Sequence, residues 1–310
     1  MFSVHWFAIT IHQDFEKVKS LWSAFFALGL GVLVDKGHGA RGYRQISEAL
    51  LGSKVYYDHV TAKEGKNHCH IEIPGSACEA VIPSVFPDLV NFLTENQVRF
   101  SIKRVDFAFD GVPFSPQDFY DGLMSENLVS LIKRDPSLEN DSIRVEQSPC
   151  RLRENGEVGT MTVYAGSSSS QRMVRVYNKR GDTRLELQLR DERAQAVCLD
   201  VFSHAWDEWE YTVKAHLRQF IDFKLLDWWA VFISVAHRAD LKISSARRMS
   251  LTKMENWFNR QVVVALSVYQ DVWGKEEAGQ RLEGLVTQAR KTRDRSRYES
   301  VLQLASTPNL

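Results

Sequence analysis

The chain has 310 residues, and its 39 Lys and Arg residues balance 39 Asp and Glu residues, so the formal net charge is zero. This balance excludes a uniformly basic DNA-coating protein, and the 44% of hydrophobic residues excludes an acidic disordered one. The length suits one large domain or two ordinary ones.

The cysteine pattern and the apolar segments favour a soluble cytoplasmic protein. The four cysteines form no CxxC pair, which excludes a zinc finger and is typical of a reducing compartment. The N-terminus lacks the basic region of a signal peptide. The apolar stretches at 22–34 and 225–236 are shorter than the roughly 20 residues that cross a bilayer.

The first hundred residues predict strands and helices in mixed order. Residues 2–11 carry apolar side chains on both alternating faces, as in a central strand, and Asp14 then caps a helix. Further strands are predicted around 43–46, 54–59, 68–73 and 99–110, with a short helix at 87–96.

The rest of the chain divides into a polar connection, a second sheet and a helical region. Residues 113–156 are read as the connection. The runs 160–165, 172–178 and 184–190 predict an antiparallel meander, and the segment after about residue 194 predicts helices whose tryptophans pack in a core. The fold class is therefore α+β, with two sheet-plus-helix halves in a catalytic domain at 1–195 and a helical region at 196–310.

Two aspartates share one face of the strand at 99–110. Alternation places Arg104, Asp106, Ala108 and Asp110 on one side and the apolar residues on the other. At about 3.3 Å per residue the two carboxylates lie roughly 13 Å apart, so at most one is expected to bind a given metal ion.

A tyrosine between two cations follows on the meander. Arg175, Tyr177 and Lys179 share a face, and adjacent positive charge would stabilise a phenolate and hold a phosphate. On the next strand Glu186 is predicted to face the tyrosine, where a carboxylate could hold a divalent ion. A half-exposed strand with ordinary surface charges is the alternative.

A third group of candidate ligands lies on the strand at 68–73. His68, His70 and Glu72 alternate onto one face, and two histidines at i and i+2 are a metal-binding geometry. Packing or surface histidines are the more common explanation of such a pair.

Four motifs in order resemble the replication initiation factor family, which includes rolling-circle initiators of small plasmids, relaxases of conjugative elements and replication proteins of filamentous phages. Residues 70–78 are similar to a family strand that ends in Glu before a Gly-containing turn, and 104–110 to its R-hydrophobe-D-x-A-x-D strand. Residues 162–179 are similar to the strand-turn-strand that carries the nucleophile, and 184–189 to its R-x-E-x-x-L strand.

The resemblance implies that Tyr177 is the nucleophile. It also implies a divalent metal, Mg²⁺ or Mn²⁺, held by Asp106 or Asp110 with Glu186 and, less directly, Glu72. The family largely lacks the histidine pair, so a metal role for His68 and His70 stays open.

The reaction that the resemblance implies is site-specific nicking and joining of origin DNA. Tyr177 would attack an unpaired phosphate in double-stranded origin DNA and form a 5′-phosphotyrosine link, while Arg175 and Lys179 orient the phosphate. No GxxxxGK[ST] loop is present, so a host helicase would unwind and a polymerase would extend the free 3′ end. A mobilisation relaxase and a silent origin-binding or repressor protein are alternatives, and a homodimer is left open.

Basic residues gather in two segments despite the neutral total. The segment 172–190 contains six basic and two acidic residues, and the segment 281–297 contains the same numbers of each. Both segments are therefore predicted to contact DNA phosphates. For the segment 281–297, a solvated helix face is the alternative. The DNA-binding candidates are Arg104, Arg172, Arg184, Arg290, Lys291 and Arg293.

Overall fold

The computed structural model describes residues 1–61, 67–130, 142–147, 161–167, 170–179, 181–234 and 263–292, with the single positions 236, 239 and 258. It divides into two compact units, Met1–Ile243 and Ser244–Leu310.

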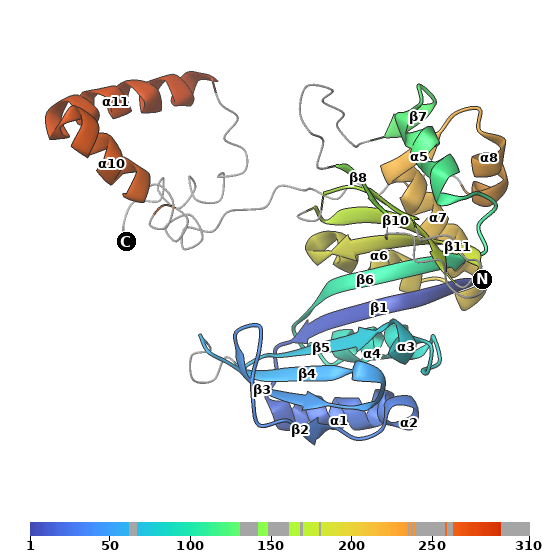
Figure 1. Ribbon diagram of the computed structural model, residues 1–310. Coiled ribbons are helices and arrows are strands. Elements are labelled where there is room, and N and C mark those ends of the chain that lie inside the picture. Colours follow the sequence, from blue (N-terminus) through green and yellow to red (C-terminus); the bar gives the residue numbers. More distant parts are fainter. Residues whose placement is uncertain are drawn as a thin grey trace. The chain divides into compact units, whose positions relative to one another are not determined.

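The first unit is built on a ten-stranded antiparallel sheet (Figure 1). The strand order is β2-β3-β4-β5-β1-β6-β11-β10-β9-β8, so β1 and β6 lie at the centre and join the two predicted halves. The bounds are β1 Phe2–Ile11, β2 Val34–Asp35, β3 Tyr43–Glu48, β4 Lys54–His59, β5 Cys69–Pro74, β6 Phe100–Asp110, β8 Ile143–Gln147, β9 Met161–Ala165, β10 Arg172–Lys179 and β11 Asp182–Arg190.

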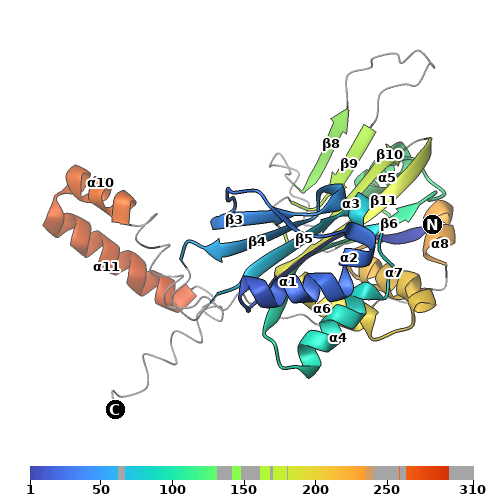
Figure 2. The ribbon, with the colours of Figure 1, turned by 90° about the horizontal axis from the view of Figure 1, so that it is seen from below.

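Helices cover one face of this sheet. The ring of Phe7 on β1 lies 4.9 Å from Phe86 on α4 and 6.5 Å from Phe202 on α6, so both helices pack on the same side. Figure 2 shows α1, α4 and α6 together on the lower side of the strands. The helices are α1 Phe15–Phe25, α2 Ala27–Leu30, α3 Gly75–Cys78, α4 Val85–Glu95, α5 Pro116–Met124, α6 Asp191–Phe202, α7 Trp209–Phe220 and α8 Asp227–Ile233, with 3₁₀ turns at Leu50–Gly52 and Trp206–Glu208.

The opposite face of the central strands is polar. Alternation on β6 and β11 sends Val105, Phe107 and Leu187 into the core and leaves Asp106 and Glu186 on the other side. The α+β class and the antiparallel meander are thus confirmed.

A bulge in β1 places two consecutive residues on the polar face. The register with β6 shifts between Val4 and Trp6. Trp6 lies opposite Asp106 and packs against the Arg104 guanidinium, 4.4 Å from its ring centroid, while the His5 ring approaches Glu186 at 3.5 Å. Without the bulge, one of these two side chains would point into the core.

The predicted connection contributes more structure than expected. Residues 113–156 include α5, whose Phe119 is fully buried, the edge strand β8, and β7 Leu128–Ser130, which pairs with β12 Ile221–Phe223 in a small second sheet. Ser115 forms a capping box at the start of α5.

The first compact unit runs past the boundary predicted at residue 195. α6 begins directly after β11 and packs on β6, and α7 buries Trp209 and Leu217. The helical prediction for the C-terminal region is confirmed in the second unit, where α10 Val263–Trp273 ends at Gly274 and α11 Lys275–Thr292 follows. In the described parts of the chain, no helix is both long and apolar enough to span a membrane.

One side chain ties α6 to the sheet. β11 ends opposite Arg104, and beyond that point the Gln195 side-chain oxygen accepts a hydrogen bond of 2.6 Å from the Ile102 amide. We expect Gln195→Leu to lower the free energy of unfolding by about 1–3 kcal/mol, because the amide loses its partner inside the fold. Urea denaturation measures this loss. The same substitution at the exposed Gln117 should change it by less than about 0.5 kcal/mol, and equal effects would contradict this account.

Candidate active site

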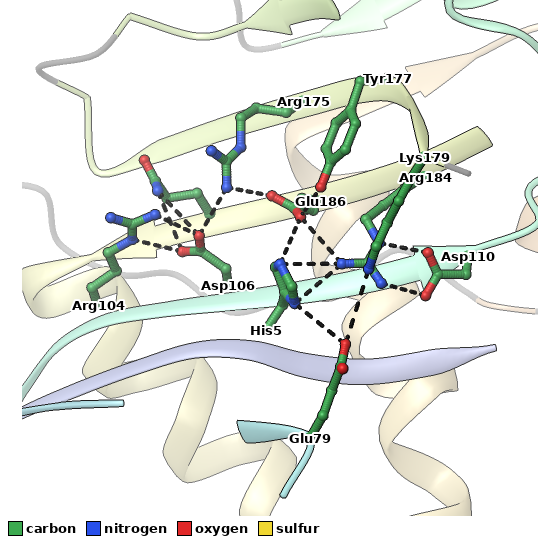
Figure 3. Close-up of polar contacts among 11 residues, drawn as sticks. His5, Glu79, Arg104, Asp106, Asp110, Arg175, Tyr177, Lys179, Arg184 and Glu186 are labelled. Atoms are coloured by element: carbon green, nitrogen blue, oxygen red, sulfur yellow. Dashed lines mark hydrogen bonds and ion pairs between the residues drawn. The ribbon is translucent and has the colours of Figure 1, made fainter. Parts of the chain in front are cut away.

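The polar face gathers chemistry-bearing side chains from four adjacent strands, β1, β6, β11 and β10 (Figure 3). The strand register explains why these side chains lie together: Arg175 on β10 lies opposite Glu186 on β11, and Glu186 lies opposite Ala108 on β6. Because Ala108 has only a methyl group, the Glu186 carboxylate and the His5 ring both have room above it.

Glu186 is the centre of this group. Its side chain is only 1% exposed, and its carboxylate accepts a hydrogen bond of 2.6 Å from the Tyr177 hydroxyl. Arg175 makes an ion pair with it, and Arg184 approaches to 3.6 Å. The prediction that Glu186 faces Tyr177 is confirmed.

The tyrosine is a protonated phenol in this environment. Burial, the hydrogen bond to Glu186 and the negative charge of that carboxylate raise the pKa of Tyr177 well above its ordinary value, and Arg184 offsets this only in part. This direction is opposite to the phenolate expected from the flanking cations. The reason is that Arg175 is held by carboxylates and Lys179 lies 4.0 Å from Glu79.

The two aspartates of β6 have separate arginine partners. Asp106, 1% exposed, accepts hydrogen bonds of 2.9 and 2.6 Å from Arg104 and one of 3.1 Å from Arg175. Asp110 accepts two of 2.5 Å from Arg184, which lower the pKa of the Asp110 carboxyl despite its partial burial. They serve different partners, as their predicted separation requires.

His5 is a site residue that the sequence analysis missed. Its ring lies between Glu186, at 3.5 Å, and Glu79, at 3.9 Å, and burial lowers the pKa of the imidazole. Gly75 at the start of α3 permits this position, because a Cβ there would lie 2.2 Å from the ring. The bulge that turns His5 to this face leaves no recognisable pattern in the sequence.

The carboxylates predicted to bind a divalent metal are paired with arginines. Among the described residues, no three His, Cys, Asp or Glu side chains come together in a way that would hold an ion. Asp106, Asp110, Glu186 and Glu72 are each neutralised by an arginine instead. In this arrangement the donor set does not fit a metal ion.

The third group of predicted ligands lies elsewhere. Glu72 on β5 is two strands from β6 and accepts a hydrogen bond from Tyr56 at 3.0 Å, and His70 bonds Thr10 at 2.9 Å and Glu72 at 3.4 Å. Although burial opposes it, the contacts with His70 and Arg41 lower the pKa of Glu72. These residues do not join Glu186.

The predicted DNA-binding arginines have different surroundings. The Arg184 side chain is 2% exposed and cannot meet a phosphate at the surface, and Arg172 points to the helical face, 4.6 Å from the Phe220 ring. Neither placement favours a DNA contact: Arg184 is buried within the sheet, and Arg172 lies on the face opposite Tyr177. Arg104 stays on the polar face, one-quarter exposed. Arg293 and the side chains of Arg290 and Lys291 lie outside the described residues.

Comparison with known proteins identifies the family and a similar fold. Residues 100–286 match the model of a family described as "Replication initiation factor", Rep_trans. The chain belongs to the replication initiation factor family. The matched segment contains β6, β10 and β11, and hence Asp106, Tyr177 and Glu186.

A solved structure has a similar fold. A rolling circle replication initiator protein from Geobacillus stearothermophilus superposes with a TM-score of 0.58 at 22% sequence identity, covering 78% of this chain and 99% of that one. No curated protein matches the chain.

Three histidines should make the protein less stable in mild acid. Burial lowers the pKa of His5, His12 and His216 in the folded state, so below pH 6.5 the unfolded chain binds more protons. We expect the free energy of unfolding to fall as the pH drops from about 7 to about 5. Urea titrations at both pH values measure the loss. Replacing the three histidines by Gln should flatten it, and an unchanged slope would contradict the assignment.

Proposed function

We propose that the protein initiates rolling-circle replication by nicking one strand of origin DNA through a covalent 5′-phosphotyrosine at Tyr177. The observation that carries this proposal is the 2.6 Å hydrogen bond from Tyr177 to the buried Glu186, on the polar face of the sheet. The family and the similar fold of a rolling circle initiator support the choice of reaction.

The raised pKa of Tyr177 makes proton removal part of the attack. As the phenolic oxygen bonds to phosphorus, its proton passes to Glu186, which already accepts the hydrogen bond. The bond from phosphorus to the 3′ oxygen breaks, and that oxygen leaves as a hydroxyl after taking a proton from a solvent water. Rejoining runs the same steps backwards, with Glu186 returning the proton to the tyrosine.

Two cations at the rim are placed to hold the phosphate. The Arg175 side chain is 25% exposed and its Nε has no hydrogen-bond partner, and Lys179 is 28% exposed. A phosphate beside Tyr177 would draw Arg175 from its carboxylates. Arg184 stays below, where it holds the charge of Glu186 and Asp110 in place.

Further parts of the proposal rest on the family resemblance. They are a divalent metal, Mg²⁺ or Mn²⁺, whose binding would require the arginines to release the carboxylates of the site, origin DNA with an unpaired nick site, a host helicase and polymerase as partners, and action in the cytoplasm. A helical second unit concerned with origin recognition or dimer formation belongs with them.

Replacing the tyrosine tests the nucleophile. Wild-type protein incubated with supercoiled origin DNA and Mg²⁺ or Mn²⁺ should give nicked circles with protein at the 5′ end, and Tyr177→Phe should give none. Denaturing gels of labelled DNA detect the adduct, and EDTA in a parallel sample tests the metal requirement. An adduct at wild-type yield with Phe at position 177 would refute the proposal.

Replacing the carboxylate tests the proton acceptor. Glu186→Gln should slow adduct formation by about 10²–10⁴-fold, because the amide cannot take the proton. It also removes a buried charge, so Asp110→Asn, which removes the partner of the same arginine, serves as a control for lost ion pairing. Single-turnover rates and melting temperatures are measured for both. An equal loss of rate in the two variants would contradict a specific role for Glu186.

A further inference from the structure

A cluster of aromatic rings lies at the end of β1 away from Tyr177. The His68 ring lies 5.6 Å from His12, 4.8 Å from His59 and 5.5 Å from Tyr43. Two of these rings come from the ends of β3 and β4, one from the residue just after β1 and one from the residue just before β5, and all four residues are half-buried. Most of them face a cavity of about 500 Å³, lined by Thr10, His12, Tyr43, His68, Arg99, Phe100, Ser101 and Lys103.

The cavity is positively charged. Arg99 and Lys103 are exposed and line it, and none of its lining residues is acidic. After burial, the positive charges of Arg99 and Lys103 are among the causes that lower the pKa of His12. Lys103 has an exposed ion pair of 3.9 Å with Asp191, a kind of contact that holds a side chain weakly.

Two ordinary explanations fit this cluster poorly. The histidines do not form a metal site, since among the described residues no such group of three ligands exists. They are not core residues either, because each ring keeps solvent exposure around an open cavity. Flat rings beside exposed cations are the combination that binds an unpaired nucleic acid strand.

The polar face connects this cluster to the candidate active site. From His5 on β1 to His12, the residue directly after β1, the extended chain spans roughly 23 Å. The half-exposed Trp6, packed on Arg104, lies along the way. The next side chains of β1 on this face, Ala8 and Thr10, are small and leave room for a bound strand above the sheet.

We propose that this cavity binds an unpaired base of single-stranded DNA by stacking on Tyr43 and His68, with the neighbouring phosphates on Arg99 and Lys103. The bound strand is the one whose scissile phosphate lies at Tyr177, and this part rests on the function proposed above. The cavity therefore selects unpaired over duplex DNA, because a base that is paired within a duplex cannot reach into the cavity to stack on these rings.

Binding to an oligonucleotide without a nick site tests the cavity separately from catalysis. Fluorescence anisotropy of full-length protein with labelled dT20 and with a 20-bp duplex gives both affinities at fixed salt. Tyr43→Ala should weaken dT20 binding about tenfold or more and leave duplex binding unchanged, whereas Tyr43→Phe should bind like wild type. Tyr211→Ala, on α7, is the matched control and should leave both affinities unchanged.

Salt dependence tests the two cations. The double variant Arg99→Ala with Lys103→Ala should reduce the slope of log affinity against log salt for dT20 by about 1.4. Wild-type dT20 binding by Tyr43→Ala, or equal losses for dT20 and duplex, would overturn the proposal. The same binding measurements are repeated in the Tyr177→Phe background, which separates the two proposals. If Tyr43→Ala still weakens dT20 binding there, but the wild-type protein forms no adduct with origin DNA, the cavity proposal stands and the nicking proposal is refuted.

Discussion

The burial of one carboxylate shapes the whole polar face. Glu186 lies in the middle of a ten-stranded sheet with almost no exposure, and a charge in that place is tolerated only if its surroundings supply hydrogen bonds and opposite charge. Arg184 supplies them from the same strand, Tyr177 and Arg175 from the neighbouring β10, and His5 from β1, two strands away. Because Glu186 needs hydrogen-bond donors, the Tyr177 hydroxyl points at it, keeps its proton and lies next to a carboxylate that can accept that proton.

Charge compensation then spreads outward through shared arginines. Arg175 connects Glu186 to Asp106, and Arg184 connects Glu186 to Asp110, so the centre of the face is nearly neutral, like the chain as a whole. A phosphate that enters must compete with carboxylates for Arg175. Exposed cations, such as Lys103 on β6, lie near the far end of β1 instead, where they could guide the DNA strand from the side.

The sequence predicts the parts of this structure that follow from alternation within regular strands. The strands at 99–110, 172–178 and 184–190 alternate cleanly, so the face shared by Tyr177 and Glu186 is readable in advance. Other features depend on what alternation lacks. A bulge re-aims His5, and the depth of Arg184 comes from its central strand. The pairing of His68 with His70 fails because β5 begins at Cys69, so His68 lies outside the alternating segment and its ring turns to Tyr43.

His5 lies on β1 and His12 is the residue directly after it, held by a backbone hydrogen bond of 2.9 Å to Arg99, so the distance between the two proposed sites is set by this strand. β1 is hydrogen-bonded to β5 on one side and to β6 on the other, so it cannot lengthen or slide without breaking both ladders. A strand bound at both places must therefore be unpaired over the whole interval between them. A short hairpin loop or bubble at the nick site meets that condition, whereas an intact duplex would present paired bases to Trp6 and to the cavity. The sheet thus sets the least length of unpaired DNA that both sites can hold at once.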